Sequence, residues 1–188
     1  MSIVDDVLFA RFCMRSRYRL MTPGPTPVPE AARAVLAEPV RHHRTAEFRA
    51  VLAEAVELLQ YVFCTRNDVA VLTGSGTGAM EACVAAAVGN GDKAIVLDSG
   101  KFAHRWTEIA RRFGAEVISL SLPWGRAYSP EMLRDALQAH PDCRAVFATL
   151  SESSTGVGHD IEGLGKVVRE SEALFVVDAI SGAGCMEC

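Results

Sequence analysis

The sequence predicts an α/β fold with a mostly parallel sheet flanked by helices. From about residue 69 onward, short apolar runs alternate with helical stretches, and the runs carry apolar residues at successive positions. Such strands are covered on both faces, which is typical of parallel sheets in alternating β and α folds. The apolar runs are residues 69–72, 94–97, 117–122, 145–150 and 174–177. The helical stretches between them are about residues 77–88, 102–113, 130–139 and 161–170.

The residues before this alternation predict a rigid loop and two helices. Prolines at alternate positions of segment 21–29 fix φ and remove amide donors, so this segment is an extended loop. Residues 30–37 are predicted to be helical. In segment 45–63, apolar residues recur every three or four positions, which predicts an amphipathic helix with Thr45 as its N-cap.

Composition indicates an ordinary globular chain. It has 188 residues, 49% of them hydrophobic, and a net charge of −4, so neither nucleic acid nor a membrane surface is an expected partner. No signal peptide or run of about 20 apolar residues is evident, which predicts a cytoplasmic protein. The six cysteines are scattered, and the Cys185–Cys188 pair lacks a second ligand pair, so no disulfide framework and no metal site are predicted.

The loop around Gly76 joins a predicted strand to a predicted helix and predicts a phosphate site. Its glycines allow a ligand to approach the backbone, and the helix start offers free amides with a partial positive charge. Ser75 and Thr77 add hydroxyl donors. One alternative is a turn whose glycines serve packing alone. The other is a dinucleotide-binding domain of an NAD-dependent dehydrogenase, because Gly74, Gly76 and Ala79 fit that fingerprint and Asp98 ends the next strand.

Three further residues follow predicted strands, at the edge where open α/β sheets bind ligands. Phe102 can stack on a planar heterocycle, although core packing explains it equally well. Ser153 belongs to a hydroxyl-rich segment that can hydrogen-bond a polar ligand or form an ordinary turn. Asp178 follows an apolar run and needs a partner there; a protonated ring nitrogen or the next turn would supply one.

Taken together, six segments resemble the class V aminotransferases of fold-type I, which use pyridoxal 5'-phosphate (PLP). The serine–pyruvate and alanine–glyoxylate aminotransferase group is the most similar. The order and spacing of the segments agree with that family over about residues 20–182. The segments are residues 22–26, 42–45, 74–77, 100–106, 152–156 and 178–181.

The resemblance implies a role for each predicted site residue. Ser75, Gly76 and Thr77 would hold the cofactor phosphate. Phe102 would stack on the pyridine ring and Asp178 would pair with its nitrogen, so these two are the catalytic candidates. The remaining two candidates are Ser153, which would hydrogen-bond near the ring hydroxyl, and Gly24, which would lie near the substrate.

The resemblance also implies an activity and an assembly. The complete relative would transfer an amino group between alanine or serine and glyoxylate or pyruvate, and would be a homodimer. Residues 1–20 would be a lead segment and residues 21–188 an incomplete PLP-binding large domain, with the small C-terminal domain absent. A truncated protein without turnover is the non-enzymatic alternative.

The family's cofactor-binding lysine is expected beyond Cys188. None of the three lysines, Lys93, Lys101 and Lys166, occupies the family position. We therefore expect this chain to be inactive alone, and unstable or dependent on a partner, since the first predicted strand would lack its neighbour. A sharp, cooperative melt of a monomer would contradict the expected instability.

Overall fold

The computed structural model describes residues 20–186, and the chain divides into two compact units, residues 1–40 and 41–188. In the first unit, α2 (Glu30–Leu36) follows the proline-rich loop, as predicted, and none of its residues is buried. The predicted lead segment falls almost wholly outside the described residues, as does Cys188.

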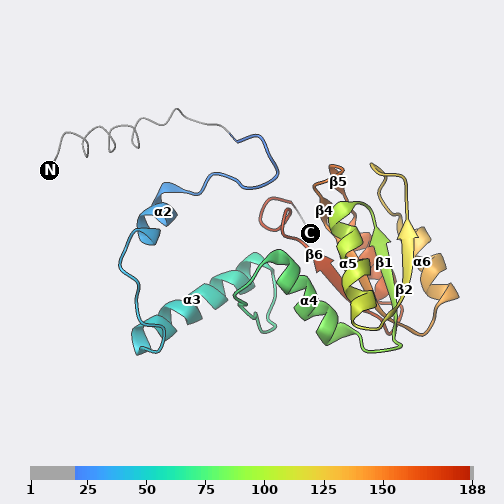
Figure 1. Ribbon diagram of the computed structural model, residues 1–188, viewed down its shortest axis with the longest axis horizontal. Coiled ribbons are helices and arrows are strands. Elements are labelled where there is room, and N and C mark those ends of the chain that lie inside the picture. The colour runs from blue at the N-terminus through green and yellow to red at the C-terminus, as the bar shows by residue number, and fades with distance from the viewer. Residues whose placement is uncertain (1–19, 187–188) are drawn as a thin grey trace. The chain divides into compact units, whose positions relative to one another are not determined.

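The second unit contains a parallel sheet of four strands in the order β2-β1-β3-β6 (Figure 1). All three neighbouring pairs are parallel, with Val96 opposite Ser119 and Thr149 opposite Asp178. This confirms the α/β fold and four of the five predicted strands. The strands are β1 (Lys93–Asp98), β2 (Glu116–Ser121), β3 (Cys143–Thr149) and β6 (Leu174–Asp178).

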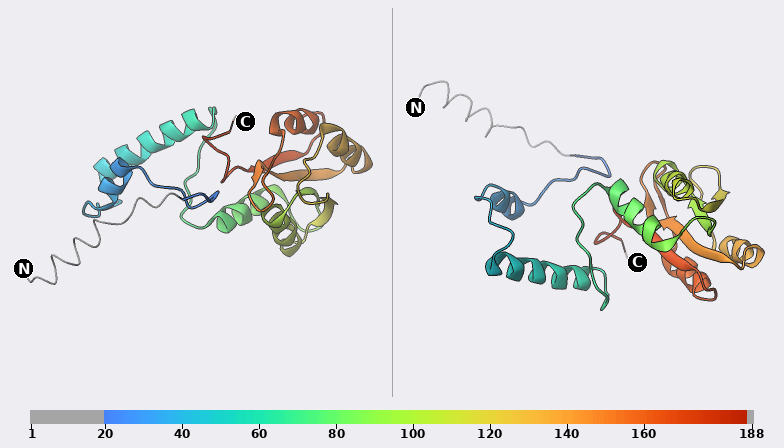
Figure 2. Two further views of the ribbon diagram at one scale, coloured as in Figure 1. Left: turned by 90° about the horizontal axis from the view of Figure 1, so that it is seen from above. Right: turned by 60° about the horizontal axis from the view of Figure 1, so that its bottom comes forward.

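Helices cover both faces of this sheet (Figure 2). The helices α4 (Gly76–Ala87) and α5 (Lys101–Arg112) pack on one face, where Trp106 stacks on Phe147 with ring centroids 4.9 Å apart. The helices α6 (Pro130–Ala139) and α7 (Ile161–Val168) pack on the other. The four helices lie close to the positions predicted for them between the apolar runs.

The prediction of a strand at residues 69–72 is wrong. In the structure this segment belongs to no strand, and the side chains of Val71 and Leu72 are 58% and 62% exposed. An isolated strand leaves its amides and carbonyls unpaired, and none of the strands among residues 20–186 lies beside this one. The apolar run alone could not supply that missing neighbour.

The preceding helix, α3 (Ala46–Val62), forms where the apolar spacing predicts it. Thr45 is its N-cap, since the Thr45 hydroxyl oxygen accepts a hydrogen bond from the Phe48 amide at 3.2 Å. None of the residues of α3 is buried. The amphipathic pattern therefore marks a helix whose apolar side chains stay largely uncovered by the described residues.

A small antiparallel hairpin follows β3 and was not predicted. Its strands are β4 (Ser151–Glu152) and β5 (Val157–Gly158), with Glu152 opposite Val157. The turn between them contains Ser153 and Ser154 and is closed by a hydrogen bond from the Gly156 amide to the Glu152 carbonyl at 2.8 Å. This hairpin brings the hydroxyl-rich segment to the carboxyl end of the sheet.

Among the helices formed by residues 20–186, none combines the length and the apolar character that crossing a membrane requires.

Candidate functional site

The last residues of three strands point to the face of the sheet that α4 and α5 cover. Each follows by two positions a residue that packs in or against the core under these helices. Since side chains two positions apart in a strand lie on the same face, the terminal residues share that face. The packed residues are Val96, Phe147 and Val176. The terminal residues are Asp98, Thr149 and Asp178.

The start of α4 has the form of an anion site. Ser75 is the N-cap, with its hydroxyl oxygen accepting from the Gly78 amide at 3.2 Å, so its hydroxyl proton remains available for donation. Ser75 and Gly76 are exposed, and a Cβ at Gly76 would meet nothing within 4 Å. Free amides at an accessible helix start favour a phosphate or carboxylate ligand.

Arg105 joins this helix start to the predicted ring-stacking residue. Its guanidinium donates a hydrogen bond to the Thr77 hydroxyl at 3.0 Å and lies 5.5 Å from the centroid of the Phe102 ring. Phe102 is half-buried in the first turn of α5. Arg105 had no predicted role, although its spacing of three from Phe102 places both residues on one helix face.

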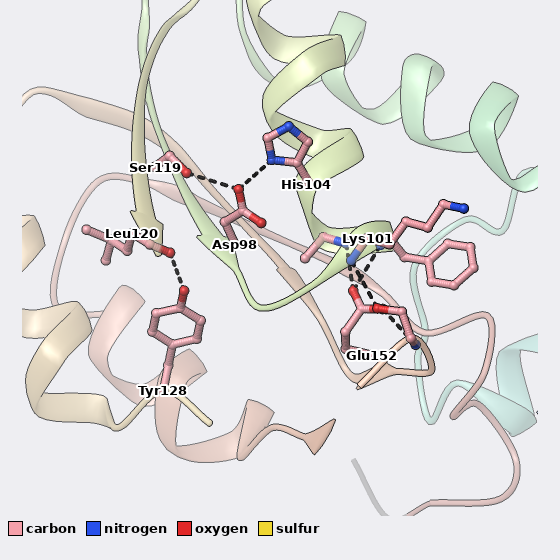
Figure 3. Close-up of polar contacts among 10 residues, drawn as sticks. Asp98, Lys101, His104, Ser119, Leu120, Tyr128 and Glu152 are labelled. Carbon is pink, nitrogen blue, oxygen red and sulfur yellow. Dashed lines mark hydrogen bonds and ion pairs between the residues drawn. The ribbon is translucent and has the colours of Figure 1, made fainter. Parts of the chain in front are cut away.

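Glu152 brings the hairpin to the start of α5 (Figure 3). Its carboxylate accepts hydrogen bonds from the Phe102 and Ala103 amides at 3.1 and 2.8 Å. Ser153 follows Glu152 directly and is half-buried. The structure therefore ties the hairpin that carries Ser153 to the helix start that carries Phe102. Glu152 was also without a predicted role, although it belongs to one of the six segments.

Asp178 keeps part of its carboxylate available. One oxygen, Oδ1, accepts a hydrogen bond from the Ile180 amide at 3.0 Å, which orients the side chain. No group among residues 20–186 donates to the other oxygen. A half-buried carboxylate with an open acceptor position suits a ligand that donates a hydrogen bond, such as a protonated ring nitrogen.

Asp98 is engaged by its neighbours. Its Oδ2 lies 2.7 Å from His104 Nδ1 and accepts from the Ser119 hydroxyl at 3.3 Å (Figure 3). In the dinucleotide alternative this carboxylate would hold a ribose hydroxyl. The structure instead gives it partners within the protein.

Gly24 belongs to the first unit, and a Cβ there would meet nothing within 4 Å. Its predicted place near the substrate stays a prediction.

Comparison with known families decides the class of the protein. The sequence pattern of the class-V aminotransferases matches residues 31–188. The chain belongs to the class-V aminotransferase family. This confirms the resemblance drawn from the six segments, and it leaves the dinucleotide-binding dehydrogenase alternative without support.

Several relatives match most of this class-V aminotransferase chain. The soluble hydrogenase 42 kDa subunit of Anabaena cylindrica is 40% identical over 174 residues, covering 91% of this chain and 45% of the relative. The alanine–glyoxylate aminotransferase of Drosophila melanogaster is 32% identical, covering 89% and 43%. The crystal structure of ureidoglycine–glyoxylate aminotransferase from Bacillus subtilis matches with a TM-score of 0.86 and 31% identity, covering 93% and 45%.

The class-V aminotransferase chain thus spans less than half the length of these relatives. Enzymes of this family depend on PLP, and the described residues fit that group. The accessible start of α4 offers amide and hydroxyl donors for a phosphate. On the same face of the sheet, Asp178 offers an acceptor for the ring nitrogen.

Proposed function

We propose that the full-length protein catalyses PLP-dependent transamination between a small amino acid, alanine or serine, and a 2-oxo acid, glyoxylate or pyruvate. The main observation in support is that two proposed cofactor contacts lie on one face of the sheet. The start of α4, with its free amides, and the carboxylate of Asp178 lie on the same side and at the carboxyl edge. Relatives named as glyoxylate aminotransferases support the choice of substrates.

We propose that Ser75, Gly76 and Thr77 bind the cofactor phosphate. The Ser75 and Thr77 hydroxyls and the first amides of α4 are the donors, and the partial positive charge of the helix start adds to the attraction. Arg105 contributes a full positive charge next to Thr77, since its guanidinium lies 3.0 Å from the Thr77 hydroxyl.

We propose that Phe102, Ser153 and Asp178 hold the ring. When bound, the cofactor supplies an electron sink for the substrate's α-carbon. Asp178 accepts a hydrogen bond from the ring nitrogen and holds the proton there. Phe102 lies against one ring face and excludes water from it. Ser153 hydrogen-bonds near the ring hydroxyl, and Gly24 leaves room for the substrate.

PLP binding to the full-length protein tests this proposal. The apoprotein is titrated with PLP while circular dichroism is followed in the absorption band of the ring. We expect a saturable signal that Asp178→Ala weakens strongly and Asp178→Asn restores in part, because the amide oxygen still accepts one hydrogen bond. No ring signal with the unsubstituted protein would reject the proposal.

Asp160→Ala is the matched control. Asp160 is the N-cap of α7, where its carboxylate accepts from the Gly163 amide at 2.9 Å, and α7 packs on the opposite face of the sheet. Its loss should lower stability and leave PLP affinity unchanged. Transamination is then assayed with three pairs: alanine with glyoxylate, serine with glyoxylate, and serine with pyruvate. Alanine with pyruvate is left out because its products are the same two compounds. Activity with none of the three pairs would reject the proposed substrates.

We further propose that the protein is a cytoplasmic homodimer, as the resemblance implies. Sedimentation equilibrium of the full-length protein measures the assembly, and a monomer at all concentrations would contradict it. Cell fractionation measures the location.

A further inference from the structure

Glu152 is a buried acid that forms no ion pair within residues 20–186. Its side chain is fully buried, with 0% exposed, and no Lys, Arg or His within residues 20–186 forms an ion pair with it. A buried carboxylate is costly unless hydrogen bonds compensate the lost water. The hydrogen-bond donors that surround the Glu152 carboxylate therefore indicate which parts of the chain this residue holds together.

All the donors come from two places, the start of α5 and Ser154. Oε2 accepts from the Phe102 amide at 3.1 Å and the Ala103 amide at 2.8 Å. Oε1 accepts from the Ser154 amide at 3.1 Å and the Ser154 hydroxyl at 2.6 Å. The Ser154 hydroxyl oxygen in turn accepts from the Lys101 amide at 3.0 Å. Three amides that begin α5 are thus bound by the hairpin, and the positive end of α5 faces the carboxylate.

Gly100 allows this close approach. A Cβ at Gly100 would lie 2.6 Å from Glu152 Cγ and 2.7 Å from Ser154 Oγ. The φ of Gly100 is 164°, an extended value open to any residue, so the requirement is for space and not for conformation. The residue before α5 and the hairpin are therefore fitted to each other.

The two segments joined in this way carry two of the proposed ring contacts. Phe102 is one of the residues whose amide Glu152 binds, and Ser153 lies between Glu152 and Ser154 in the chain. We propose that Glu152 is a positioning residue that fixes Phe102 and Ser153 relative to each other for cofactor binding. This rests on the proposed function. Glu152 acts through these two residues, whereas the proposed phosphate donors Ser75, Gly76 and Thr77 belong to α4 and form no hydrogen bond with it.

The test separates ring binding from phosphate binding in the full-length protein. Glu152→Ala should lower the affinity for PLP roughly tenfold and reduce the circular dichroism per bound ring, because several hydrogen bonds to a charged group are lost. The affinity for inorganic phosphate, measured by its competition with PLP, should be unchanged. Glu152→Gln should recover only part of the PLP affinity. Its side-chain oxygen can still accept from the Phe102 and Ala103 amides, but its side-chain NH2 is a donor and cannot accept from the Ser154 amide.

Leu133→Ala is the control for lost stability alone. Leu133 is fully buried on α6, in the core on the opposite face of the sheet. All variants are compared at a temperature where each is folded, and Leu133→Ala should keep the PLP affinity and the ring signal of the unsubstituted protein. An unchanged ring signal and affinity in Glu152→Ala would overturn the role of Glu152 alone. No ring signal in the unsubstituted protein would instead overturn the cofactor assignment, and the role of Glu152 with it.

Discussion

The guanidinium of Arg105 hydrogen-bonds the Thr77 hydroxyl at 3.0 Å and also lies 5.5 Å from the centroid of the Phe102 ring. The Arg105 side chain thus lies beside both Thr77, proposed to bind the phosphate, and Phe102, proposed to stack on the ring. A cation near both a phosphate site and an aromatic face favours an anionic, planar ligand between them.

Replacing Arg105 should weaken PLP binding. We expect Arg105→Ala to lower the affinity roughly tenfold, because a charge-assisted interaction near the phosphate is removed. Arg105→Lys should recover only part, since a lysine cannot reproduce the planar fork of the guanidinium. Titration of the apoprotein with PLP measures both variants.

Arg134→Ala is a suitable control for this experiment. Arg134 lies on α6, where its partner is Glu170 at 3.6 Å, and α6 packs on the opposite face of the sheet. The Arg134→Ala substitution removes the same charge as Arg105→Ala and leaves the residues of the proposed site unchanged. Equal losses of affinity in Arg105→Ala and Arg134→Ala would show that net charge, and not position, decides binding.

The sequence could predict the elements whose signal is local. The apolar runs located β1, β2, β3 and β6, and the helical stretches between these runs located α4 to α7. Residues 69–72 carry the same local signal and form no strand, because strand formation needs a neighbouring strand, which a local pattern does not reveal.

The same distinction applies to the candidate site. Ser75, Phe102 and Asp178 could be singled out because each stands at the end of a predicted element, where ligands bind. The spacing of Arg105 from Phe102 could have placed both on one helix face, but the hydrogen-bond partners of Glu152 and Arg105 could not be predicted, because they are about fifty and twenty-eight positions away in the chain. A contact of that kind depends on strand order and helix packing, which the sequence pattern alone does not contain.

Replacing Ser75 should affect both stability and binding. The Ser75 hydroxyl oxygen caps α4 by accepting from the Gly78 amide. Ser75→Ala should therefore cost about 1 kcal/mol of stability and weaken PLP binding, because a cap and a phosphate donor are lost together. Ser75→Thr should preserve both, since threonine keeps the hydroxyl. Thermal unfolding and PLP titration measure the two effects, and full PLP affinity in Ser75→Ala would contradict the phosphate role.

Acid should destabilise the protein through His159. Burial lowers the pKa of the His159 imidazole below 6.5, and the nearby negative charge of Glu152 opposes that shift only in part. The folded state therefore favours the neutral ring, which is stacked on Tyr128 with centroids 5.8 Å apart. Stability from this residue is fully present above the unfolded pKa and is lost as pH falls through the folded pKa.

His159→Phe tests this directly, because phenylalanine retains an aromatic ring beside Tyr128 and cannot be protonated. The midpoint temperature of unfolding is measured from about pH 7 to about pH 5 for both proteins, the range around the free imidazole's pKa. The unsubstituted protein should lose more stability over this range than the variant. Parallel curves would show that His159 does not contribute to the acid sensitivity.

Replacing Gly114 by alanine should be more destabilising than the same replacement at Gly125, although both glycines have a positive φ. Gly114 and Gly125 have φ values of +85° and +89°, so alanine is strained at either position by about 1 kcal/mol or more. At Gly114 the added Cβ would also lie 3.2 Å from Asn90 Cα and closer still to its side chain, whereas at Gly125 it would meet nothing within 4 Å. Gly114→Ala should therefore lower the unfolding temperature further than Gly125→Ala. Equal losses would show that the turn after α5 moves away from Asn90 without cost, and that backbone strain alone determines the effect.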